Sequence, residues 1–243
     1  MVAPRYVPGA RMYCIGDIHG RADLLEDLHG AILGDVEGFD GERHVLYLGD
    51  YIDRGTQSRE VIDMLLDDPL PGFERIFLRG NHEQAMLDFM QHPENVAGWL
   101  GFGGRETLAS YGVNVSLFPL MKELPELARS LAAHLPDTHL AFLDSGLDSW
   151  RGGDYFFAHA GIRPGVPLDE QHTEDLLWIR DEFLQSPANH GVVVVHGHTI
   201  TTEPEMLPNR IGIDTGAFHS GVLTALVLEG TEQRLLQTGP EAA

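Results

Sequence analysis

The stretch RMYCIGDIHG, residues 11–20, decides the fold. Its apolar half, RMYCI, is typical of a buried strand, and a polar loop containing glycine follows directly. The same unit recurs along the chain, because further apolar runs end in polar loops at 44–48, 75–78, 155–157 and 192–195. In sheets of this kind the loops that follow the strands meet at one edge, where ligands bind. We therefore predict a sheet with its polar loops gathered at that edge.

Apolar residues at helical spacing separate these loops, at 21–33, 58–66 and 83–90. The alternation of strand, loop and helix predicts an α/β fold. From about residue 98 to 146, glycine and proline interrupt the helical pattern, which we interpret as an inserted helical cap. Near the end of the chain, 211–214 and 222–228 alternate in polarity and predict a returning antiparallel pair of strands that could build a second sheet.

The chain has 243 residues and a formal net charge of -21. Its length is sufficient for one hydrophobic core, so we expect a single domain over residues 1–243. The excess of carboxylates repels nucleic-acid phosphates, and lysine and arginine form no basic stripe, so we expect no nucleic-acid partner. The single cysteine, Cys14, cannot form an internal disulfide. Without a signal peptide or a membrane-spanning stretch, we expect a cytoplasmic protein with no membrane partner, and its oligomeric state stays open.

The polar loops carry carboxylate, imidazole and amide side chains beside glycine, and they read GDIHG (16–20), GDYIDRG (49–55), GNHE (80–83), HAG (159–161) and HGHT (196–199). Glycine lets the backbone turn tightly and approach an ion closely. Nitrogen and oxygen ligands without thiolate suit manganese, iron or zinc, and they argue against a structural zinc–thiolate site. The loops thus supply a candidate set of metal ligands: Asp17, His19, Asp50, Asn81, His159 and His198.

Taken in order, GDIHG, GDYIDRG, GNHE, HAG and GHT resemble the motifs of the phosphoprotein phosphatase family, within the calcineurin-like metallophosphoesterases. The resemblance extends from about residue 12 to 228, and the chain is most similar in length to the bacterial and phage serine/threonine phosphatases. It implies a central β-sandwich flanked by helices, with layers in the order α/β/β/α.

The resemblance also implies two divalent metal ions, with Mn²⁺ favoured and iron or zinc as alternatives. Two ions that share a carboxylate can lower the pKa of a water between them and clamp the phosphoryl oxygens. The resemblance divides the ligands into Asp17 and His19 on one ion, Asn81, His159 and His198 on the other, and Asp50 as the bridge.

The loop at 196–199 contains two histidines, His196 and His198. Residues two apart on a strand share a face, so spacing alone allows either imidazole to reach a metal. The GHT motif of the resemblance selects His198, and we interpret His196 as a residue that supports the site or the fold.

The resemblance makes His82 the acid that protonates the leaving alcohol and Asp53 the carboxylate that orients it. A positioned general acid contributes roughly 10²–10⁴ in rate. Arg54 and Arg180 resemble the family's phosphate-binding arginines, whose planar guanidinium matches two phosphate oxygens. Arg163, in HAGIRPG, is a third candidate for this role.

Other motifs have less defined expectations. We interpret Asp214, in IDTGA, as a carboxylate that braces a turn. The glycine-rich segment 101–112, GFGGRETLASYG, is a candidate for covering the site. The tryptophans, Trp99 among them, are expected to pack in the core or the cap.

We therefore expect a serine/threonine-type protein phosphatase that acts on a phosphoprotein or phosphopeptide by direct attack of a metal-bridging hydroxide. Phosphotyrosine is a further candidate substrate. The sequence contains no CxxxxxR or DxDx[TV] motif that would supply a covalent nucleophile.

Alternative functions remain open at this stage. Similar bacterial enzymes are symmetrical diadenosine tetraphosphate hydrolases, and this is the first alternative. A nuclease is disfavoured, because nucleases of the superfamily usually carry GHxH where this chain has GHTI. A metal-binding or partner-binding module without catalysis is a weaker alternative, since all the ligands and the acid are present.

Overall fold

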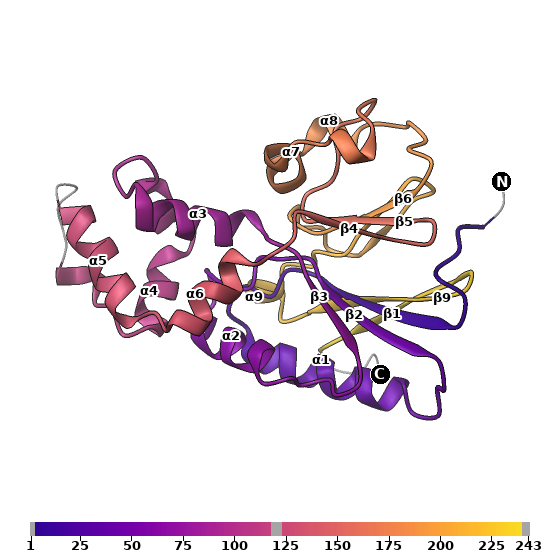
Figure 1. Cartoon of the computed structure of the whole chain (residues 1–243), viewed down its shortest axis with the longest axis horizontal. Helices are drawn as coiled ribbons and strands as arrows, with labels where there is room; N and C mark the ends of the chain where they lie inside the picture. Colours follow the sequence, from indigo (N-terminus) through magenta and orange to yellow (C-terminus); the bar gives the residue numbers. More distant parts are fainter. Residues whose placement is uncertain (1–2, 118–122, 240–243) are drawn as a thin grey trace.

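The computed structural model describes residues 3–117 and 123–239, and two five-stranded sheets form its centre (Figure 1). The first sheet has the order β10-β9-β1-β2-β3. In it β1, β2 and β3 are parallel, whereas β9 runs antiparallel to β1 and β10 antiparallel to β9. Its strands are β1 (Ala10–Ile15), β2 (Glu42–Tyr47), β3 (Glu74–Phe77), β9 (Thr224–Glu229) and β10 (Glu232–Gln237).

The second sheet has the order β4-β5-β6-β8-β7. Its central strands β5, β6 and β8 are parallel, and β4 and β7 are antiparallel edges. Its strands are β4 (Ser149–Gly152), β5 (Tyr155–Ala158), β6 (Val193–His196), β7 (Glu205–Met206) and β8 (Arg210–Gly212). All five apolar runs that were predicted as strands are confirmed, with ends shifted by one or two residues.

The prediction for the end of the chain is wrong. The segments 211–214 and 222–228 do not pair with each other, because β8 lies parallel to β6 in the second sheet and β9 lies antiparallel to β1 in the first. Helix α9 (Ala217–Ser220) lies between them, so the chain crosses from one sheet to the other instead of forming a hairpin. Both segments are apolar enough to be buried in either sheet, and tertiary packing decides which one they join.

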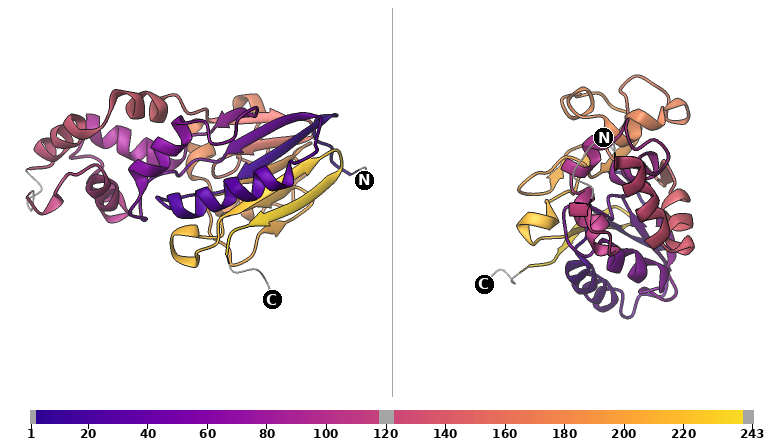
Figure 2. Two further views of the ribbon diagram at one scale, coloured as in Figure 1. Left: turned by 90° about the horizontal axis from the view of Figure 1, so that it is seen from below. Right: turned by 90° about the vertical axis from the view of Figure 1, so that its left-hand side faces the viewer.

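Helices cover both outer faces of the paired sheets, as Figures 1 and 2 show. Helices α1 and α2 lie against the first sheet, and α7 and α8 lie over the second. The predicted α/β/β/α layering is confirmed. The helices are α1 (Ala22–Asp35), α2 (Ser58–Leu66), α3 (Asn81–Gln91), α4 (Gly104–Ser110), α5 (Leu124–His134), α6 (Asp137–Asp144), α7 (Thr173–Trp178), α8 (Asp181–Leu184) and α9, with 3-10 helices η1 (Ala97–Gly101), η2 (Val115–Leu117) and η4 (Leu168–Glu170).

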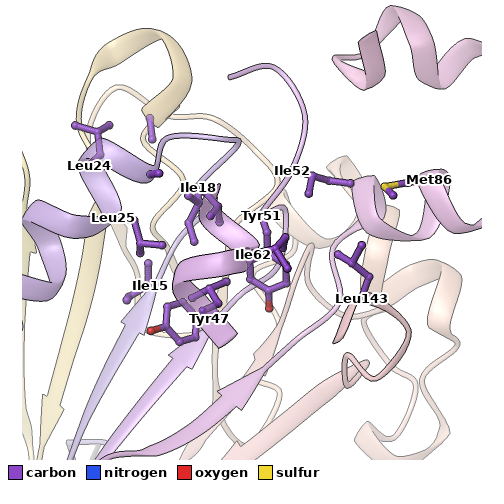
Figure 3. Packing of buried hydrophobic residues seen from close by; sticks show 14 of the residues in the cluster. Ile15, Ile18, Leu24, Leu25, Tyr47, Tyr51, Ile52, Ile62, Met86 and Leu143 are labelled. Carbon is purple, nitrogen blue, oxygen red and sulfur yellow. The ribbon is translucent and has the colours of Figure 1, made fainter. Parts of the chain in front are cut away.

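Side-chain alternation along β1 explains the layers. Met12 and Cys14 are buried between the two sheets, whereas Tyr13 and Ile15 face the helices. Figure 3 shows Ile15 in the helix-side core, where residues of α1 and α2 surround it. Each fully buried apolar side chain of this size contributes about 1.5–3 kcal/mol relative to an exposed one. The burial of Cys14, which is fully enclosed, agrees with the apolar run in which it lies.

The described residues of 98–146 form short helices joined by turns, and residues 118–122 lie outside the description. The apolar side chains of this segment, among them Trp99, Leu108 and Leu131, belong to the same buried cluster as those of α1 and α2. Figure 2 shows these helices beyond one end of the sheets. Because they share a core with the first sheet, they extend its helical layer. No described helix has the length and apolarity that crossing a membrane requires.

Candidate metal centre

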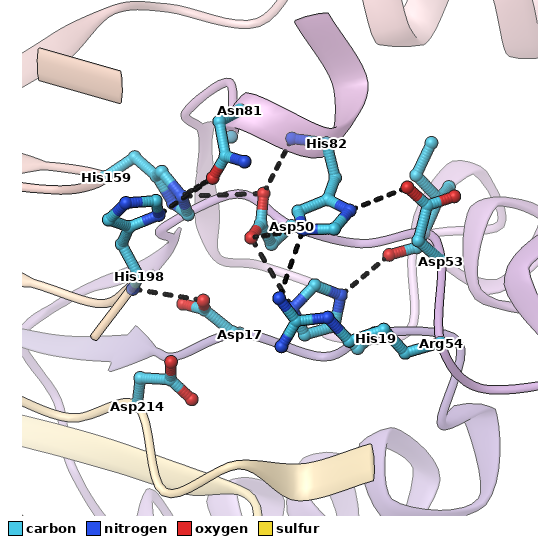
Figure 4. A network of polar contacts seen from close by, with 12 residues as sticks. Asp17, His19, Asp50, Asp53, Arg54, Asn81, His82, His159, His198 and Asp214 are labelled. Atoms are coloured by element: carbon cyan, nitrogen blue, oxygen red, sulfur yellow. Dashed lines mark hydrogen bonds and ion pairs between the residues drawn. The ribbon is translucent and has the colours of Figure 1, made fainter. Parts of the chain in front are cut away.

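The loops that follow β1, β2, β3, β5 and β6 converge at the carboxyl ends of their strands, as the α/β pattern predicts (Figure 4). Backbone hydrogen bonds join the first two loops, because the N–H groups of Ile18 and His19 donate to the Asp50 carbonyl at 3.1 and 2.9 Å. Another joins the loops of the second sheet, where the Gly197 N–H donates to the His159 carbonyl at 2.8 Å. The predicted ligands are thereby brought together from both sheets.

Backbone strain concentrates at these loops. Among the described residues other than glycine, positive φ occurs at His19, Asp50, Asp53, Arg54, His198 and Asp68. All of these except Asp68 are predicted site residues. Left-handed backbone is costly for residues with a side chain, and it persists where surrounding structure enforces it, often at functional sites.

Two groups of side chains at this edge can each hold a metal ion, and they share Asp50. One contains His19, Asp50 and His82, and the other contains Asp50, His159 and His198, with the ligand atoms of each group within 4.8 Å of one another. Asp50 Oδ2 lies 3.5 Å from His19 Nε2, and Asp50 Oδ1 lies 3.4 Å from His159 Nε2. The two oxygens of one carboxylate thus face different groups, as the predicted bridge requires.

Of the other two predicted ligands, Asn81 lies close to the second group, whereas Asp17 belongs to neither group. Asn81 Oδ1 lies 2.9 Å from His159 Nε2 and 2.8 Å from His198 Nδ1. It therefore lies beside the second group, and its role as a metal ligand stays a prediction. Asp17 lies at the rim, where its Oδ2 accepts a hydrogen bond from the His198 N–H at 3.0 Å.

Two buried polar atoms at this edge fit a cation. Asp17 Oδ1 and His19 Nε2 are buried and have no hydrogen-bond partner among the described residues. Unpaired buried polar atoms are costly, and a metal ion bound by these atoms would remove that cost. Burial raises the pKa of Asp17 well above its usual value, and the nearby carboxylates of Asp214 and Asp50 raise it further. Because these carboxylates repel one another, a positive charge between them would be favourable.

The imidazoles of the site are in the form that binds metals. Burial lowers the pKa of His19 to about 3 and that of His198 to about 2, and burial also lowers the pKa of His159. These rings are therefore neutral near pH 7, with a lone pair available for a metal. Burial alone would raise the pKa of Asp50, but the positive charge that its neighbouring imidazoles carry when protonated, first His159 and then His82, lowers it below its usual value. Asp50 is therefore ionised, which suits a shared metal ligand.

His82 and Asp53, the predicted acid and its partner, lie in contact. His82 Nδ1 is 2.6 Å from Asp53 Oδ2, and His82 Nε2 points toward Asp50 Oδ2 at 3.8 Å. Burial opposes a charge on His82, yet Asp50 and Asp53 raise its pKa above the usual value, so the ring can carry a proton near neutral pH. Arg54 Nη2 lies 3.3 Å from His82 Nε2, which places a guanidinium beside that nitrogen.

The remaining arginines differ in their surroundings. Arg180 Nη1 donates to Thr199 Oγ1 at 3.1 Å and to the His198 carbonyl at 3.4 Å, so its guanidinium lies next to the second group. Arg163 instead forms a two-bond pair with Asp175, at 2.8 and 2.5 Å. This pair occupies the face of the guanidinium that a phosphate would use, and the phosphate-binding role of Arg163 stays a prediction.

His196 and Asp214 lie around the predicted ligands. His196 is buried against Phe183, with ring centroids 5.2 Å apart, and it belongs to neither metal-binding group. Asp214 Oδ1 accepts the Gly216 N–H at 2.9 Å, which is the turn-bracing contact expected from the sequence. Burial also raises the pKa of Asp214 to about 6, so this carboxylate is a candidate for sharing a proton at the rim of the site.

Glu83 is a structural residue of the site that the sequence interpretation left without a role. Its Oε2 accepts the N–H groups of Asp50 and Gly80 at 2.8 and 2.9 Å, and its Oε1 accepts that of Tyr51 at 2.9 Å. Glu83 is the third residue of α3 and Gly80 is the N-cap, so a glutamate at the position that can return to the N-cap N–H was the signal that could have identified it. It ties the loop of Asp50 to the start of α3.

Comparison with known proteins agrees with this arrangement. The family model described as calcineurin-like phosphoesterase matches residues 10–217. Members of this family use a dinuclear divalent metal centre, and the two groups that share Asp50 could bind such ions.

Solved structures with this fold include proteins of different stated activity. One, provisionally assigned as a diadenosine tetraphosphatase, is 22% identical with a TM-score of 0.64, over 98% of this chain and 99% of that chain. A cold-active protein-tyrosine phosphatase from a psychrophilic Shewanella species is 18% identical with a TM-score of 0.60, over 96% and 82%. A Saccharomyces cerevisiae serine/threonine phosphatase similar to human phosphatase PP5 is 15% identical with a TM-score of 0.52, over 97% and 82%. At these identities the likeness establishes the fold.

The two histidines of HGHT provide a matched test of the ligand set. We expect His198→Asn to weaken Mn²⁺ binding by more than about 100-fold. Loss of a residue that only hydrogen-bonds to a metal ligand already lowers metal affinity by roughly 10–100-fold, and loss of a ligand should lower it further. His196→Asn removes a buried imidazole outside both groups and should leave the affinity unchanged. Titration calorimetry of the metal-free proteins measures this, with circular dichroism to confirm folding. Equal weakening in both variants would contradict the assignment.

Proposed function

The chain belongs to the calcineurin-like phosphoesterase family, and on that premise we propose that it is a phosphatase for phosphoserine and phosphothreonine in proteins. Phosphotyrosine is a second substrate in this proposal. The observation that carries it is the placement of the His82–Asp53 pair and Arg54 beside the groups that share Asp50. This combination suits a phosphate ester whose leaving group needs a proton.

The cofactors we propose are two divalent ions, with Mn²⁺ favoured for a ligand set of imidazole, carboxylate and amide and iron or zinc as alternatives. When bound, such a pair supplies an activated water and neutralises charge on the phosphoryl group. Asp50 would be shared, Asp17 and His19 would complete one side, and the other side would be formed by Asn81, His159 and His198.

The residues of the chain supply the other parts of the reaction. His82 Nε2 faces the groups around Asp50, and when the ring is protonated this nitrogen can donate a proton to the departing alkoxide. Asp53 accepts the hydrogen bond from Nδ1 and fixes the direction of the ring. Arg54 and Arg180 stand on different sides of the site and can each hold phosphoryl oxygens.

The surroundings of Arg180 support a phosphoprotein substrate over a polyphosphate. Beside it lies an open cleft of about 650 Å³, lined by Arg163 and by the carboxylates of Glu174, Asp175, Asp181 and Glu182. Arg163 is already paired with Asp175, so the cleft is acidic overall. An acidic wall repels the additional phosphates of a dinucleoside polyphosphate, whereas a peptide brings only one phosphoryl group.

One observation favours the alternative, hydrolysis of diadenosine tetraphosphate. The Trp178 side chain lines the same cleft and is 48% exposed. Its ring lies edge-on to His198, with centroids 6.1 Å apart. An exposed aromatic ring beside a phosphate site can stack with a nucleobase. The protein provisionally assigned as a diadenosine tetraphosphatase, which has this fold, gives the alternative a second basis.

Direct comparison of the two substrates tests the proposal. We expect kcat/KM in manganese buffer to be higher for a phosphoserine peptide than for diadenosine tetraphosphate, since the acidic cleft disfavours the polyphosphate. The His198→Asn variant, purified in parallel, controls for a contaminating phosphatase. A preference for the dinucleotide of about 100-fold, equivalent to about 2.7 kcal/mol of transition-state stabilisation, would overturn the choice of substrate.

His82→Asn tests the proposed acid. We expect kcat for the phosphoserine peptide to fall by about 10²–10⁴ while bound manganese stays at the wild-type level, because the ring acts on the leaving group. His92→Asn is the matched control, since His92 caps the other end of α3 and is exposed. Loss of metal together with activity would instead make His82 a ligand, a role that its place in the first group permits.

A further inference from the structure

The Asp53 carboxylate is fully buried and accepts hydrogen bonds from three side chains. Besides His82, Trp99 Nε1 donates to Oδ2 at 2.7 Å and Thr107 Oγ1 donates to Oδ1 at 2.5 Å. Trp99 lies in η1 and Thr107 in α4, both within the helical segment that the sequence suggested as a cap. Asp53 is therefore held from a part of the chain outside the five loops.

Thr107 contacts Asp53 at two points. Its Oγ1 donates to the carboxylate and also accepts the Asp53 N–H at 2.9 Å. The Ser58 hydroxyl lies 3.1 Å from Thr107 Oγ1 and itself accepts the Asp53 N–H at 3.1 Å. A hydroxyl has one donor and two acceptor positions, so these partners use the full capacity of Thr107. They also stabilise Asp53 in its left-handed conformation, with φ at 73°.

The same segment contacts the next residue, Arg54. The Arg54 N–H donates to the Gly103 carbonyl at 3.4 Å. Gly103 has φ at 113°, and a Cβ at this position would lie 2.3 Å from the Arg54 nitrogen. Only glycine permits this close approach, which explains part of the GFGG run. The segment from Trp99 to Thr107 thus touches both the partner of His82 and the predicted phosphate-binding arginine.

We propose that Trp99 and Thr107 are positioning residues for proton donation: they fix the Asp53 carboxylate, which in turn directs His82 toward the leaving group. This role rests on the proposed phosphatase function. Trp99 and Thr107 are 2% and 0% exposed, so they act through Asp53 and not by touching a substrate. With either donor removed, Asp53 can rotate, and the His82 ring loses the hydrogen bond that orients it.

The consequence depends on the leaving group. A serine alkoxide is a poor leaving group and needs a proton as the bond to phosphorus breaks, whereas p-nitrophenolate leaves as a stable anion. Loss of orientation at His82 should therefore slow hydrolysis of a phosphoserine peptide much more than hydrolysis of p-nitrophenyl phosphate. A general loss of folding or of metal would slow both substrates equally.

Thr107→Val and Trp99→Phe test the role, because each keeps the approximate shape and removes one donor. We expect kcat for the phosphoserine peptide to fall about 10-fold in each variant, because each loses one hydrogen bond to a charged group. The kcat for p-nitrophenyl phosphate should change by less than about twofold. Thr107→Ser keeps the hydroxyl and should restore the wild-type ratio of the two rates. Thr138→Val, at an exposed position in α6, and Trp150→Phe, in β4, are the matched controls.

A second readout does not depend on activity. NMR of metal-free protein labelled with ¹⁵N-histidine can detect the hydrogen-bonded proton on His82 Nδ1, whose signal should be protected from exchange with water. We expect Thr107→Val and Trp99→Phe to broaden this signal. The control variants should leave it unchanged. An equal loss on both substrates, with the signal unchanged, would overturn the positioning role. A wild-type protein that hydrolyses neither substrate contradicts the proposed function instead, and the proton signal then decides the positioning role by itself.

Discussion

The site depends on one buried carboxylate that faces two ways. Asp50 is 1% exposed and directs one oxygen at His19 and the other at His159, so it links side chains from both sheets. A buried charge is stable only when it is paired and hydrogen-bonded, and the His82 N–H and the imidazoles around Asp50 provide these partners. Glu83 holds the backbone on both sides of Asp50, which keeps that carboxylate in place.

The packing of the two sheets makes this arrangement possible. Side chains such as Met12, Leu46, Phe157 and Val195 fill the space between the sheets, so the carboxyl ends of strands from both sheets lie at one edge. The loops there can then supply ligands to a common centre, at the cost of left-handed backbone at several residues. The helices of 97–144 share the core of the first sheet and reach the same edge, where Trp99 and Thr107 hold Asp53. Fold stability and site geometry therefore depend on the same contacts.

The sequence predicted the local elements well and the long-range contacts poorly. Short apolar runs identified every loop of the site, and helical spacing gave the bounds of α2 correctly at Ser58–Leu66. The partners of β8 and β9 were mispredicted, because the sequence of an apolar strand does not specify which strand it pairs with. The roles of Thr107 and Trp99 were missed for a related reason, since Thr107 lies 54 positions and Trp99 46 positions from Asp53, and no periodicity connects them. The Arg163–Asp175 pair was likewise not foreseeable from the HAGIRPG motif.

The surroundings of the shared carboxylate carry the proposed choice of substrate. An acidic cleft with one exposed indole lies on the side of Arg180, and the His82–Asp53 pair lies on the other. The proposed function requires two cations, one on each side of the Asp50 carboxylate. The most direct test is anomalous diffraction from crystals grown with Mn²⁺, recorded at the manganese edge. We expect two peaks, one on each side of the Asp50 carboxylate, with His19 against one and His159 and His198 against the other. A single peak, or two peaks with Asp50 contacting only one of them, would contradict this expectation.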